Sequence, residues 1–506
     1  MGAQRGGGRR QPDRGGGSTT RLSICIVAAC LAGFFPGCAP ERGASDVPIG
    51  SRDAPGYVLF SPLLSATTYL IDKRGRAVRA WRSEVPPGAS VYLLDNGHLL
   101  RCGRQPGVPV FNGGGEGGRI QEFTWDGDLV WDFVLASGDR LQHHDIEPLP
   151  NGNVLLIAWE RKSAAEAVAA GRRPDRVGEA GLRPDMILEV RPQPPRGGTV
   201  VWEWHLWDHL IQEHDRRARN YGSVAEHPER VDINGGERAA PLTTALLERL
   251  RSLGYLAGPP ATPDRFADFT HGNAIAHHAG LDQIALSVNT FNEIWIIDHG
   301  TTTDEAAGHG GGRAGRGGDL LYRWGNPGAY GRGTAAHRKF FGQHDVRWIP
   351  DDRTGAGHLL VFNNGSGRPR GDYSSVMEIA PPVDAAGRYT LAAGGRYGPE
   401  EPAWEYTAPD RASFFAEFIS GAQRLPGGNT LICDGPRGRF FEVTPNGSTV
   451  WEYLNPYSGD APNPHGDPPF SVFFATHIPP DHPGLRGREP MPLDPQPPRS
   501  RGNAVP

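Results

Sequence analysis

Hydrophobic and polar positions alternate over short stretches along most of the chain, and polar turns separate these stretches. In residues 120–158, two short apolar stretches flank a Trp-Asp-Gly turn, and a Pro-Asn-Gly-Asn turn precedes a further apolar stretch. Alternation with a period of two is typical of β-strands, and Asn-Gly or Asp-Gly between such stretches is the strongest short signal for a hairpin. The pattern therefore predicts antiparallel strands joined by tight turns.

The same unit recurs along the chain: a strand, a polar turn, a strand that often carries Trp, a loop, a third strand, an Asn-Gly-like turn and a fourth strand. A repeated four-stranded unit predicts an all-β, six-bladed β-propeller, here over residues 55–485, with one blade expected over residues 120–158. The strand at residues 57–60 is expected to complete the last blade, which would close the ring and protect strand edges. Tryptophans at matched repeat positions are predicted to be packing residues: Trp81, Trp131, Trp202 and Trp451.

Two insertions and a tail interrupt this rhythm. Residues 205–268 contain leucines at helical spacing, Leu242, Leu246, Leu250 and Leu253, which predicts a partly helical insertion. Residues 299–318 are rich in glycine but lack the Gly-Lys-Ser/Thr ending of a phosphate-binding loop, so we predict a flexible rim loop or lid. Residues 486–506 are predicted to form a disordered tail.

The N-terminus predicts export. Five arginines precede an apolar stretch at residues 22–35, which is the pattern of a signal peptide over residues 1–38, followed by a linker over residues 39–54. Cys38 stands where a lipidated cysteine would attach the protein to a membrane. Phe35 and Pro36 match the lipoprotein pattern poorly, so lipidation stays open. The expected location is the periplasm or the outer surface.

Composition narrows the possible partners and cofactors. The chain of 506 residues has a formal charge of −5 and no basic stripe, which excludes a typical nucleic-acid surface. Cys102 and Cys433, the two cysteines that follow the signal region, lie in strand-like stretches and are predicted to be buried free thiols. No disulfide framework is expected. The sequence does not indicate an oligomeric state.

Matched positions of the repeat carry histidine. His144 and His344 both precede Asp and both stand six residues before a proline, and His271 takes nearly the same place in the unit between them. A further unit has Ser420 there. Equivalent positions on successive blades converge on the axis, so these side chains are predicted to meet at the axial mouth. Asp145 and Asp345 could orient the preceding histidine or bond to backbone amides, and both interpretations stay open.

These motifs, together with the recurrent Pro-Asn-Gly-Asn and Val-Trp-Glu-Tyr units, resemble the bacterial, nucleotide-independent arylsulfotransferases over about residues 57–480. The resemblance implies a periplasmic propeller without a cofactor. Such an enzyme moves a sulfuryl group from an aryl sulfate to a phenol through a sulfohistidine. By motif, His344 would be the nucleophile, while His271 with Asn273, and His144, would hold sulfate oxygens and shuttle protons. A neutral imidazole is a suitable nucleophile for such a two-step transfer.

The chain departs from the family at one position. The family has an arginine after the Ser of the strand that follows His-x-Asn, and here Asn289 takes that place. Substrate contacts are therefore predicted from Asn273, Asn289, Asp345 and Ser420, and a replacement cation from Arg347, Arg368, Arg424 or Arg437. Two other functions stay open. The three histidines could hold Zn²⁺ or Cu²⁺, or the propeller could bind a ligand without catalysis.

Overall fold

In the computed structural model of the protein, the described residues are 53–500, apart from 108–110, 112, 237–242, 257–265, 393 and 460–469. The predicted signal peptide, Cys38, most of the predicted linker and Leu242 lie outside the described residues, as do residues 501–506. Export and lipidation therefore remain predictions.

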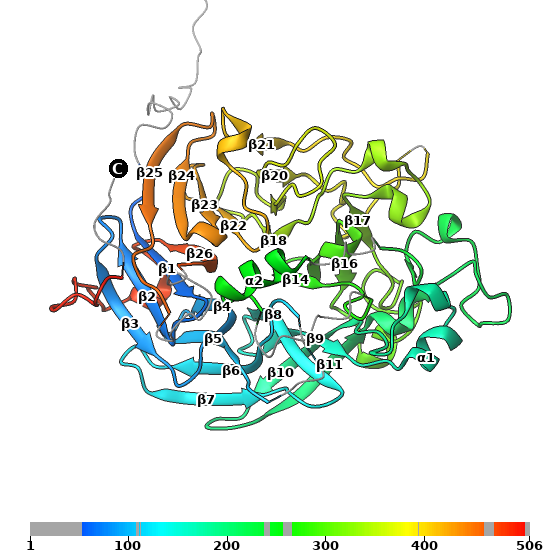
Figure 1. The fold of residues 1–506 in the computed structure, drawn as a ribbon, viewed down its shortest axis with the longest axis horizontal. Coiled ribbons are helices and arrows are strands. Elements are labelled where there is room, and N and C mark those ends of the chain that lie inside the picture. The colour runs from blue at the N-terminus through cyan, green and yellow to red at the C-terminus, as the bar shows by residue number, and fades with distance from the viewer. Residues whose placement is uncertain are drawn as a thin grey trace, which may run out of the picture. The chain divides into compact units, whose positions relative to one another are not determined.

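The described chain forms six four-stranded antiparallel sheets arranged as the blades of a β-propeller, which confirms the predicted fold (Figure 1). From the axis outward, the first blade is β26 (Val472–Ile478), β1 (Tyr57–Pro62), β2 (Thr67–Asp72) and β3 (Ala77–Arg82), and the second is β4 (Pro87–Leu93), β5 (Leu99–Arg104), β6 (Gly118–Phe123) and β7 (Leu129–Val134). The third blade is β8 (Arg140–Pro148), β9 (Val154–Glu160), β10 (Asp185–Pro192) and β11 (Gly198–His205), and the fourth is β14 (Gly272–His278), β15 (Gln283–Val288), β16 (Glu293–Asp298) and β17 (Tyr322–Trp324). The fifth blade is β18 (His344–Trp348), β19 (Leu359–Asn363), β20 (Ser375–Ile379) and β21 (Trp404–Tyr406), and the sixth is β22 (Gly421–Arg424), β23 (Thr430–Asp434), β24 (Arg439–Val443) and β25 (Thr449–Leu454).

The two ends of the described chain share one blade. The C-terminal strand β26 pairs with the N-terminal strand β1, with Val58 opposite His477 in the register. The six inner strands contact one another in a closed ring, β26 with β4, β4 with β8, and onward to β22 with β26. The predicted closure by residues 57–60 is confirmed, because β1 and β26 belong to one blade and so join the two ends of the ring.

The predicted blade boundaries are wrong by two strands. The unit expected over residues 120–158 consists of the outer strands of one blade, β6 and β7, and the inner strands of the next, β8 and β9. The hairpins were identified correctly, but a polar turn within a blade resembles a polar connection between blades. Only the pairing of strands fixes where a repeat begins.

One tryptophan from the outer strand of each blade fastens that blade to the next. The indole N–H of Trp81 donates to the Thr124 carbonyl at 3.0 Å, and that of Trp131 donates to the Gly197 carbonyl at 2.7 Å. The same donation from a tryptophan to the following blade continues around the ring, from Trp202 to Thr301, Trp324 to Pro399, Trp404 to Pro445 and Trp451 to Lys73. The predicted packing role of the repeated tryptophans is thus confirmed, and the structure adds that they join neighbouring blades by hydrogen bonds.

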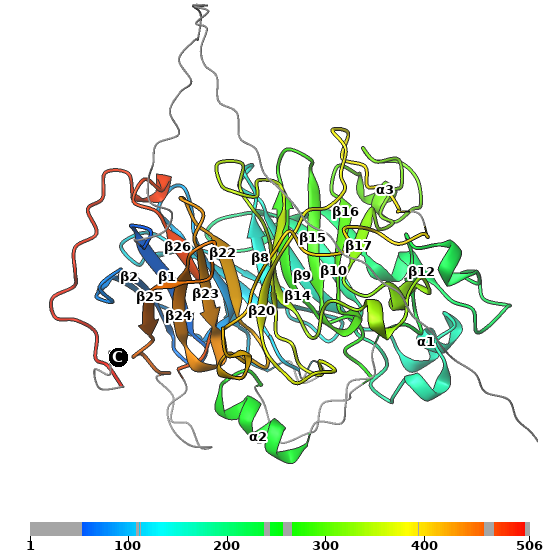
Figure 2. The same ribbon diagram turned by 90° about the horizontal axis from the view of Figure 1, so that it is seen from above.

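The insertion at residues 205–268 supplies a helix, α2 (Thr244–Ser252), that caps one end of the axis. Figure 1 places α2 over the centre of the ring, and Figure 2 shows it at one end of the sheets. Thr243 caps its N-terminus by accepting from the Leu246 amide, and its buried Leu247 and Leu250 pack on Phe418 and Phe473. The predicted helix thus covers the axial mouth, but Leu247 and Leu250 form its buried face, whereas Leu246 of the predicted stripe is exposed.

The remaining elements are short. They are the parallel pair β12 (Leu210–Ile211) and β13 (Val231–Asp232), the helices α1 (Ala164–Ala169) and α3 (Thr303–Ala306), and nine 3₁₀ turns among the described residues: η1 (Pro174–Arg176), η2 (Leu206–His209), η3 (Val224–Glu226), η4 (Asn289–Phe291), η5 (Pro327–Tyr330), η6 (Ala335–His337), η7 (Arg411–Ser413), η8 (Gly435–Arg437) and η9 (Pro483–Leu485). None of the described helices has the length and apolar character needed to cross a membrane.

Two segments predicted to be flexible make specific contacts. In the glycine-rich loop, α3 begins with a capping box of Thr302 and Glu305, and the Gly318 amide donates to the Gly308 carbonyl at 3.1 Å. Residues 486–500, expected as a disordered tail, run without regular structure along β3. The Leu493 amide donates to the Ala77 carbonyl at 2.8 Å, and the Gln496 side chain accepts from the Ala77 amide at 2.8 Å. The tail thus satisfies backbone groups on the exposed edge of β3.

Candidate active site

The three predicted histidines lie in or directly before three neighbouring inner strands. His144 lies within β8, His271 directly precedes β14, and His344 is the first residue of β18. The ring centroids of His144 and His271 are 4.6 Å apart. A charge on His344 lowers the pKa of His144, and a charge on His271 lowers the pKa of His344, so all three interact electrostatically. The structure therefore brings them together at the axis.

The backbone is strained where these strands begin. Eight non-glycine residues of the described chain have positive φ, and six lie at the starts of inner strands: Ala89, His144, His271, Asp345, Ile419 and Ser420. β-Bulges interrupt the strand register at the same places in β4, β8, β14 and β18. A bulge re-aims side chains, and left-handed conformations of non-glycine residues cluster at functional sites. The strain marks this end of the axis as the candidate site.

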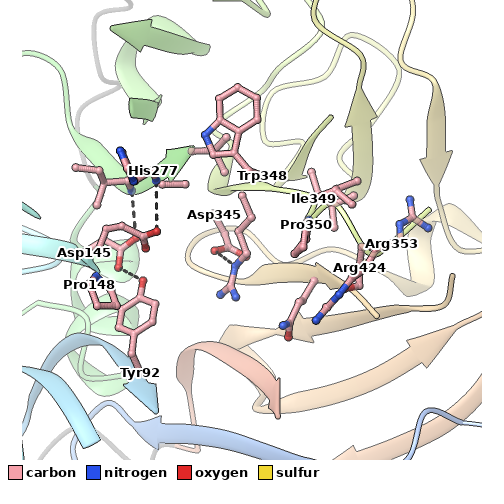
Figure 3. Close-up of a pocket in the computed structure, with 17 residues that line it drawn as sticks. Tyr92, Asp145, Pro148, His277, Asp345, Trp348, Ile349, Pro350, Arg353 and Arg424 are labelled. Atoms are coloured by element: carbon pink, nitrogen blue, oxygen red, sulfur yellow. Dashed lines mark hydrogen bonds and ion pairs between the residues drawn. The ribbon is translucent and has the colours of Figure 1, made fainter. Parts of the chain in front are cut away.

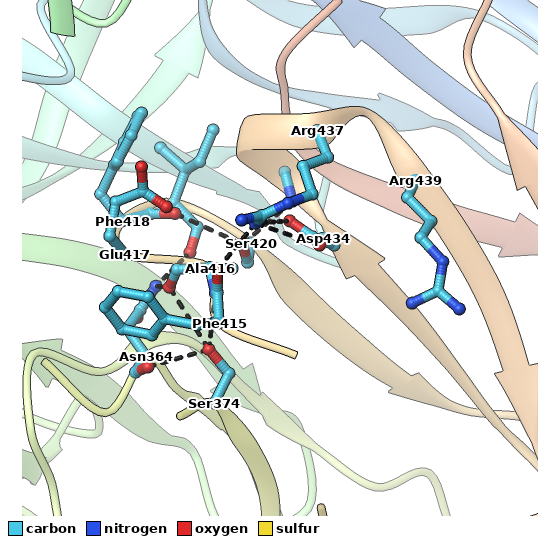
Figure 4. Close-up of polar contacts among 12 residues, drawn as sticks. Asn364, Ser374, Phe415, Ala416, Glu417, Phe418, Ser420, Asp434, Arg437 and Arg439 are labelled. Carbon is cyan, nitrogen blue, oxygen red and sulfur yellow. Dashed lines mark hydrogen bonds and ion pairs between the residues drawn. The ribbon is translucent and has the colours of Figure 1, made fainter. Parts of the chain in front are cut away.

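The tautomer of His344 is fixed by Asn364. Figure 4 shows Asn364 beside residues 415–420, where its Nδ2 donates to the Ala416 and Ile419 carbonyls at 2.8 and 2.9 Å. Its Oδ1 therefore faces His344 Nδ1 at 2.7 Å, and Nδ1 must carry the proton. Burial lowers the pKa of His344 to about 4, although the bond from Asn364 acts in the opposite direction. His344 is thus neutral near pH 7, with a lone pair on Nε2, which is buried and has no hydrogen-bond partner.

The proton positions of His143 and His144 follow from Asp185. Its carboxylate lies 3.0 Å from His143 Nε2, so that nitrogen carries a proton. His143 Nδ1 then accepts from His144 Nδ1, at 2.7 Å. This leaves a lone pair on His144 Nε2, which accepts from the Tyr255 hydroxyl at 3.2 Å. Burial, followed by the neighbouring histidines, holds the pKa of His144 well below its usual value, so it can act as a base.

His271 is the cationic member of the cluster. Burial alone would lower its pKa, but the adjacent Asp268 carboxylate, which bonds to Nδ1, raises the pKa above its usual value. Its Nε2 lies 3.2 Å from the Tyr255 hydroxyl. That hydroxyl donates to His144, so it accepts from His271. A phenol is therefore already held between a neutral imidazole and a cationic one.

Tyr255 reaches the histidines from the segment that follows α2, across a loop of glycines. A Cβ at Gly114 would lie 2.1 Å from the Tyr255 ring, and one at Gly115 would lie 2.2 Å from the His144 ring. Gly115 also accepts the His144 amide at 2.7 Å. Only residues without a side chain allow the backbone to approach both rings so closely.

Asn273 and Asn289 support the nucleophile through the backbone. Both side chains donate from Nδ2 to the Gln343 carbonyl, at 2.8 and 3.2 Å. Gln343 directly precedes His344. The side-chain amide of Gln343 donates from Nε2 to the carbonyls of Val288 and Glu293. Asn273 Oδ1 is buried without a partner. These bonds position the segment that carries His344. Contact of the two asparagines with substrate remains a prediction.

Asp145 and Asp345 join adjacent blades. Asp145 Oδ2 accepts the Ile275 amide at 3.1 Å, and Asp345 Oδ2 accepts the Ala422 amide at 2.7 Å. Of the two interpretations left open by the sequence, the structure supports bonding to backbone amides. Ser420 also has structural partners, because its hydroxyl accepts from the Gly435 amide at 3.0 Å. Substrate contacts from Asp345 and Ser420 remain predictions.

A cavity of about 280 Å³ lies beside Asp145 and Asp345, the residues that follow His144 and His344 in the chain. Figure 3 shows the side chains that line it. Asp145, Asp345 and Glu147 line it, and Tyr92 donates to Asp145 at 2.7 Å. Burial raises the pKa of Asp145 to about 6 and that of Glu147 to about 8. Arg347, Arg353 and Arg424 line it as well, so the cavity holds charged groups of both signs. At the histidine end, His271 provides the positive charge.

The four arginines considered as replacements for the family cation all have partners. They pair with Asp345, Ser375, Glu378 and Asp434, in the order Arg347, Arg368, Arg424 and Arg437. Figure 4 shows Arg437 turned toward Asp434. The protonated His271 is therefore the cation that lies within the histidine cluster itself.

Asn364, Asp268 and Tyr255 were not identified from the sequence as site residues. Asn364 and Tyr255 contact histidines 20 and 111 positions away. Asp268 lies three residues before His271, but nothing in the local pattern distinguishes it from other loop acids. The axial metal alternative gains no support, because the groups of described residues that bring three metal-binding side chains within 4.8 Å do not include His144, His271 or His344.

Comparison with known proteins gives one informative match. A family model described as Arylsulfotransferase (ASST) matches residues 63–451. No curated protein matches the chain.

Solved structures resemble the chain at low identity. A protein of unknown function from Bacteroides caccae is 11% identical, with a TM-score of 0.41, over 83% of this chain and 98% of its own. A virginiamycin B lyase from Staphylococcus aureus is 11% identical, with a TM-score of 0.35, over 82% of this chain and 84% of its own. Both TM-scores are below 0.5, so these structures give no information about the function of this chain.

Proposed function

Because the chain belongs to the arylsulfotransferase family, we propose that it moves a sulfuryl group from an aryl sulfate to a phenol through a sulfohistidine at His344. The observation that carries this proposal is the neutral His344, whose Nε2 lone pair is buried without a partner. An unpaired lone pair in a site that also contains a base and a cation is the arrangement required of a nucleophile.

In the first half-reaction, His344 Nε2 attacks the sulfur of the aryl sulfate. The N–S bond forms, the bond from sulfur to the aryl oxygen breaks, and the leaving phenolate takes a proton from His271. The positive charge of His271 also stabilises charge on the sulfuryl oxygens. His271 thereby provides the positive charge of the family arginine, whose place in this chain is taken by Asn289.

In the second half-reaction, the hydroxyl of the acceptor phenol takes the place of the Tyr255 hydroxyl. His144 Nε2 removes the phenol proton while the phenol oxygen attacks sulfur, the O–S bond forms, and the N–S bond to His344 breaks. The proton gained by His144 then passes to His271, which gave up its own in the first half-reaction, and the starting charges are restored. The pose of Tyr255, 3.2 Å from both His144 Nε2 and His271 Nε2, supports a phenol as acceptor.

The test is incubation of the purified protein with a chromogenic aryl sulfate, with and without phenol, followed by mass spectrometry of the peptide that contains residue 344. The donor alone should add one sulfuryl group to His344, and phenol should remove it. His344→Ala should abolish both turnover and labelling. His337→Ala is the matched control, because the side chain of His337 bonds to Thr334 and not to any residue of the histidine cluster. Turnover that persists in His344→Ala would rule out the sulfohistidine.

Export belongs to the same proposal. The basic and apolar pattern of residues 1–38 supports secretion, with the propeller acting outside the cytoplasm. Fractionation of cells expressing the full chain should recover a processed protein outside the cytoplasm, and recovery of the unprocessed chain in the cytoplasm would contradict export.

A further inference from the structure

Three side chains outside the axial cluster hold the glycine-rich loop against the start of the insertion. His209, at the end of η2, lies with Nδ1 2.9 Å from Asp319 Oδ1, and His309 in the loop lies with Nδ1 2.8 Å from the same oxygen. Ligand atoms of the three residues lie within 4.8 Å of one another. We infer that His209, His309 and Asp319 form a site for a divalent transition metal, with Zn²⁺ as the best match.

The proton on His209 supports this inference. Its Nε2 lies 2.9 Å from the Ala306 carbonyl, which can only accept, so Nε2 carries a proton. A neutral His209 then presents a lone pair from Nδ1 to the Asp319 carboxylate. The Nδ1 lone pair and the Asp319 carboxylate thus face each other inside the protein, and a cation between the two groups satisfies both. A backbone carbonyl that fixes the far nitrogen is also the usual support of a metal-binding histidine.

The neighbours of His209 and Asp319 hold these two ligands in place. The His209 ring stacks on Trp204, with centroids 5.5 Å apart and planes 6° from parallel. A Cβ at Gly318 would lie 2.6 Å from His209 Nε2, so this glycine makes room for the ring. Asp319 is buried, whereas the His309 side chain is 45% exposed. The exposed side leaves an open position for water, as in a metal site with three protein ligands.

The donor set identifies the class of metal. Two imidazole nitrogens and one carboxylate suit Zn²⁺, Ni²⁺ or Cu²⁺ and not Ca²⁺ or Mg²⁺, which prefer oxygen ligands. Tetrahedral Zn²⁺ with bonds of about 2.0–2.1 Å separates its ligand atoms by about 3.3 Å. The two N–O separations here need to grow by only about 0.5 Å.

A metal here would have a structural role, separate from the axial reaction. It would fasten residues 299–318 to η2, and a segment so rich in glycine loses much conformational entropy when it is ordered. The described chain contains a second cluster, His277, Asp282 and His299, that provides a control. There His299 lies between Asp282 at 2.7 Å and Glu189 at 3.1 Å, which suits a protonated imidazole.

The experiment is calorimetric titration of Zn²⁺ into the purified full chain after it has been stripped with a chelator. Cobalt substitution then reports the ligand set through its absorption spectrum. We expect one tight equivalent in the wild type. Loss of a residue that only hydrogen-bonds to a metal ligand weakens metal binding by about 10- to 100-fold. His309→Ala and Asp319→Asn each remove a ligand itself, so each should weaken Zn²⁺ binding by at least that factor. His299→Ala should bind as the wild type does.

Three results would overturn the site: no tight equivalent in the wild type, unchanged binding in His309→Ala, or loss of the equivalent in His299→Ala. Asp319→Asn removes a buried charge and could fail to fold, whereas His309→Ala truncates a half-exposed ring and keeps the test decisive. Melting with and without chelator adds an independent measurement, because bound Zn²⁺ should raise the melting temperature of the wild type but not that of His309→Ala.

Discussion

Two histidines of this site differ in charge, one neutral and one cationic, because different groups face their Nδ1 atoms. His344 Nδ1 faces an amide oxygen, from Asn364, and burial keeps the ring neutral. His271 Nδ1 faces the Asp268 carboxylate, which favours the cation. Environments that move two pKa values apart assign different roles to similar groups. Here the assignments are nucleophile and cation.

This difference predicts a bell-shaped pH profile for kcat/KM with aryl sulfates. Activity requires neutral His344, so it should fall as the pH drops through about 4. It also requires charged His271, whose pKa is raised, so activity should fall at high pH as that ring loses its proton. Asp268→Asn removes the raising carboxylate, so burial then dominates. The basic limb should move to lower pH, and the rate at neutral pH should fall about 100-fold.

The acid limb reports His344, which faces Asn364 and Gly342 and not Asp268. Because charge on His271 lowers the pKa of His344, loss of that charge in Asp268→Asn should move the acid limb only to higher pH, in the direction opposite to the basic limb. A basic limb that does not move would show that His271 is not the charged group.

The three histidines could be predicted from the sequence because each stands at a matched position of a repeat. The groups that give them their protonation states could not be predicted. Asn364 contacts His344 because it directly follows β19, which pairs with β18 in the same blade, and Tyr255 lies in an insertion that no repeat aligns. Residue type and spacing thus indicated which side chains meet, whereas long-range packing determines their charge.

At the scale of elements, the segment after α2 places a phenol where the proposed acceptor binds. Tyr255→Ala removes this internal competitor and leaves a space the size of its ring. We expect kcat/KM to rise about tenfold, the equivalent of about one hydrogen bond to a charged group. p-Cresol, which matches the lost side chain, should become the preferred acceptor. A series of substituted phenols assayed with both proteins would measure this preference.

Leu246→Ala is the matched control for that change, because Leu246 lies on the exposed face of α2, with 37% of its surface accessible. It should leave the acceptor preference unchanged. If Tyr255→Ala and Tyr255→Phe both lower kcat, Tyr255 would instead be a proton donor in the reaction.

The glycine loop gives a second prediction at this scale. Gly115→Ala puts a Cβ 2.2 Å from the His144 ring and should displace that base, so transfer to phenol should slow by about 100-fold or more. Gly107→Ala is the control, because Gly107 has a similar φ of +85° but nothing within 4 Å of the added Cβ. The backbone strain is shared, so only contact with the ring distinguishes the two variants. Equal rates, measured by single-turnover desulfation of His344, would contradict a role for His144 as the base.

Elements were easier to predict than their grouping. The hairpin at residues 120–133 and the helix within residues 205–268 follow from local turn chemistry and from helical spacing. The assignment of β6 and β7 to one blade and of β8 and β9 to the next depends on strand pairing between distant residues, such as Arg101 with Gln121. Local periodicity cannot contain that information.

For the whole molecule, six repeats and a shared first blade were predictable, since each unit carries its own turns and tryptophan. The ring of indole bonds explains why tryptophan recurs. Each one both fills space in an outer strand and satisfies a group on the next blade. Stability should therefore depend on how deeply a given indole is buried at its junction.

Two junctions allow this to be measured with one substitution. Trp131 is fully buried and donates to the Gly197 carbonyl at 2.7 Å, whereas Trp404 is only half-buried and donates to the Pro445 carbonyl at 2.9 Å. Trp→Phe removes the same hydrogen bond at both. At Trp131 it also leaves a cavity and an unsatisfied carbonyl, so we expect a loss of about 2–4 kcal/mol in the free energy of unfolding. At Trp404, water can replace the indole, and the loss should be about 1 kcal/mol. Chemical denaturation of the two variants would measure both values. Equal losses would mean that the indole bond, and not burial between blades, determines how firmly the ring is held.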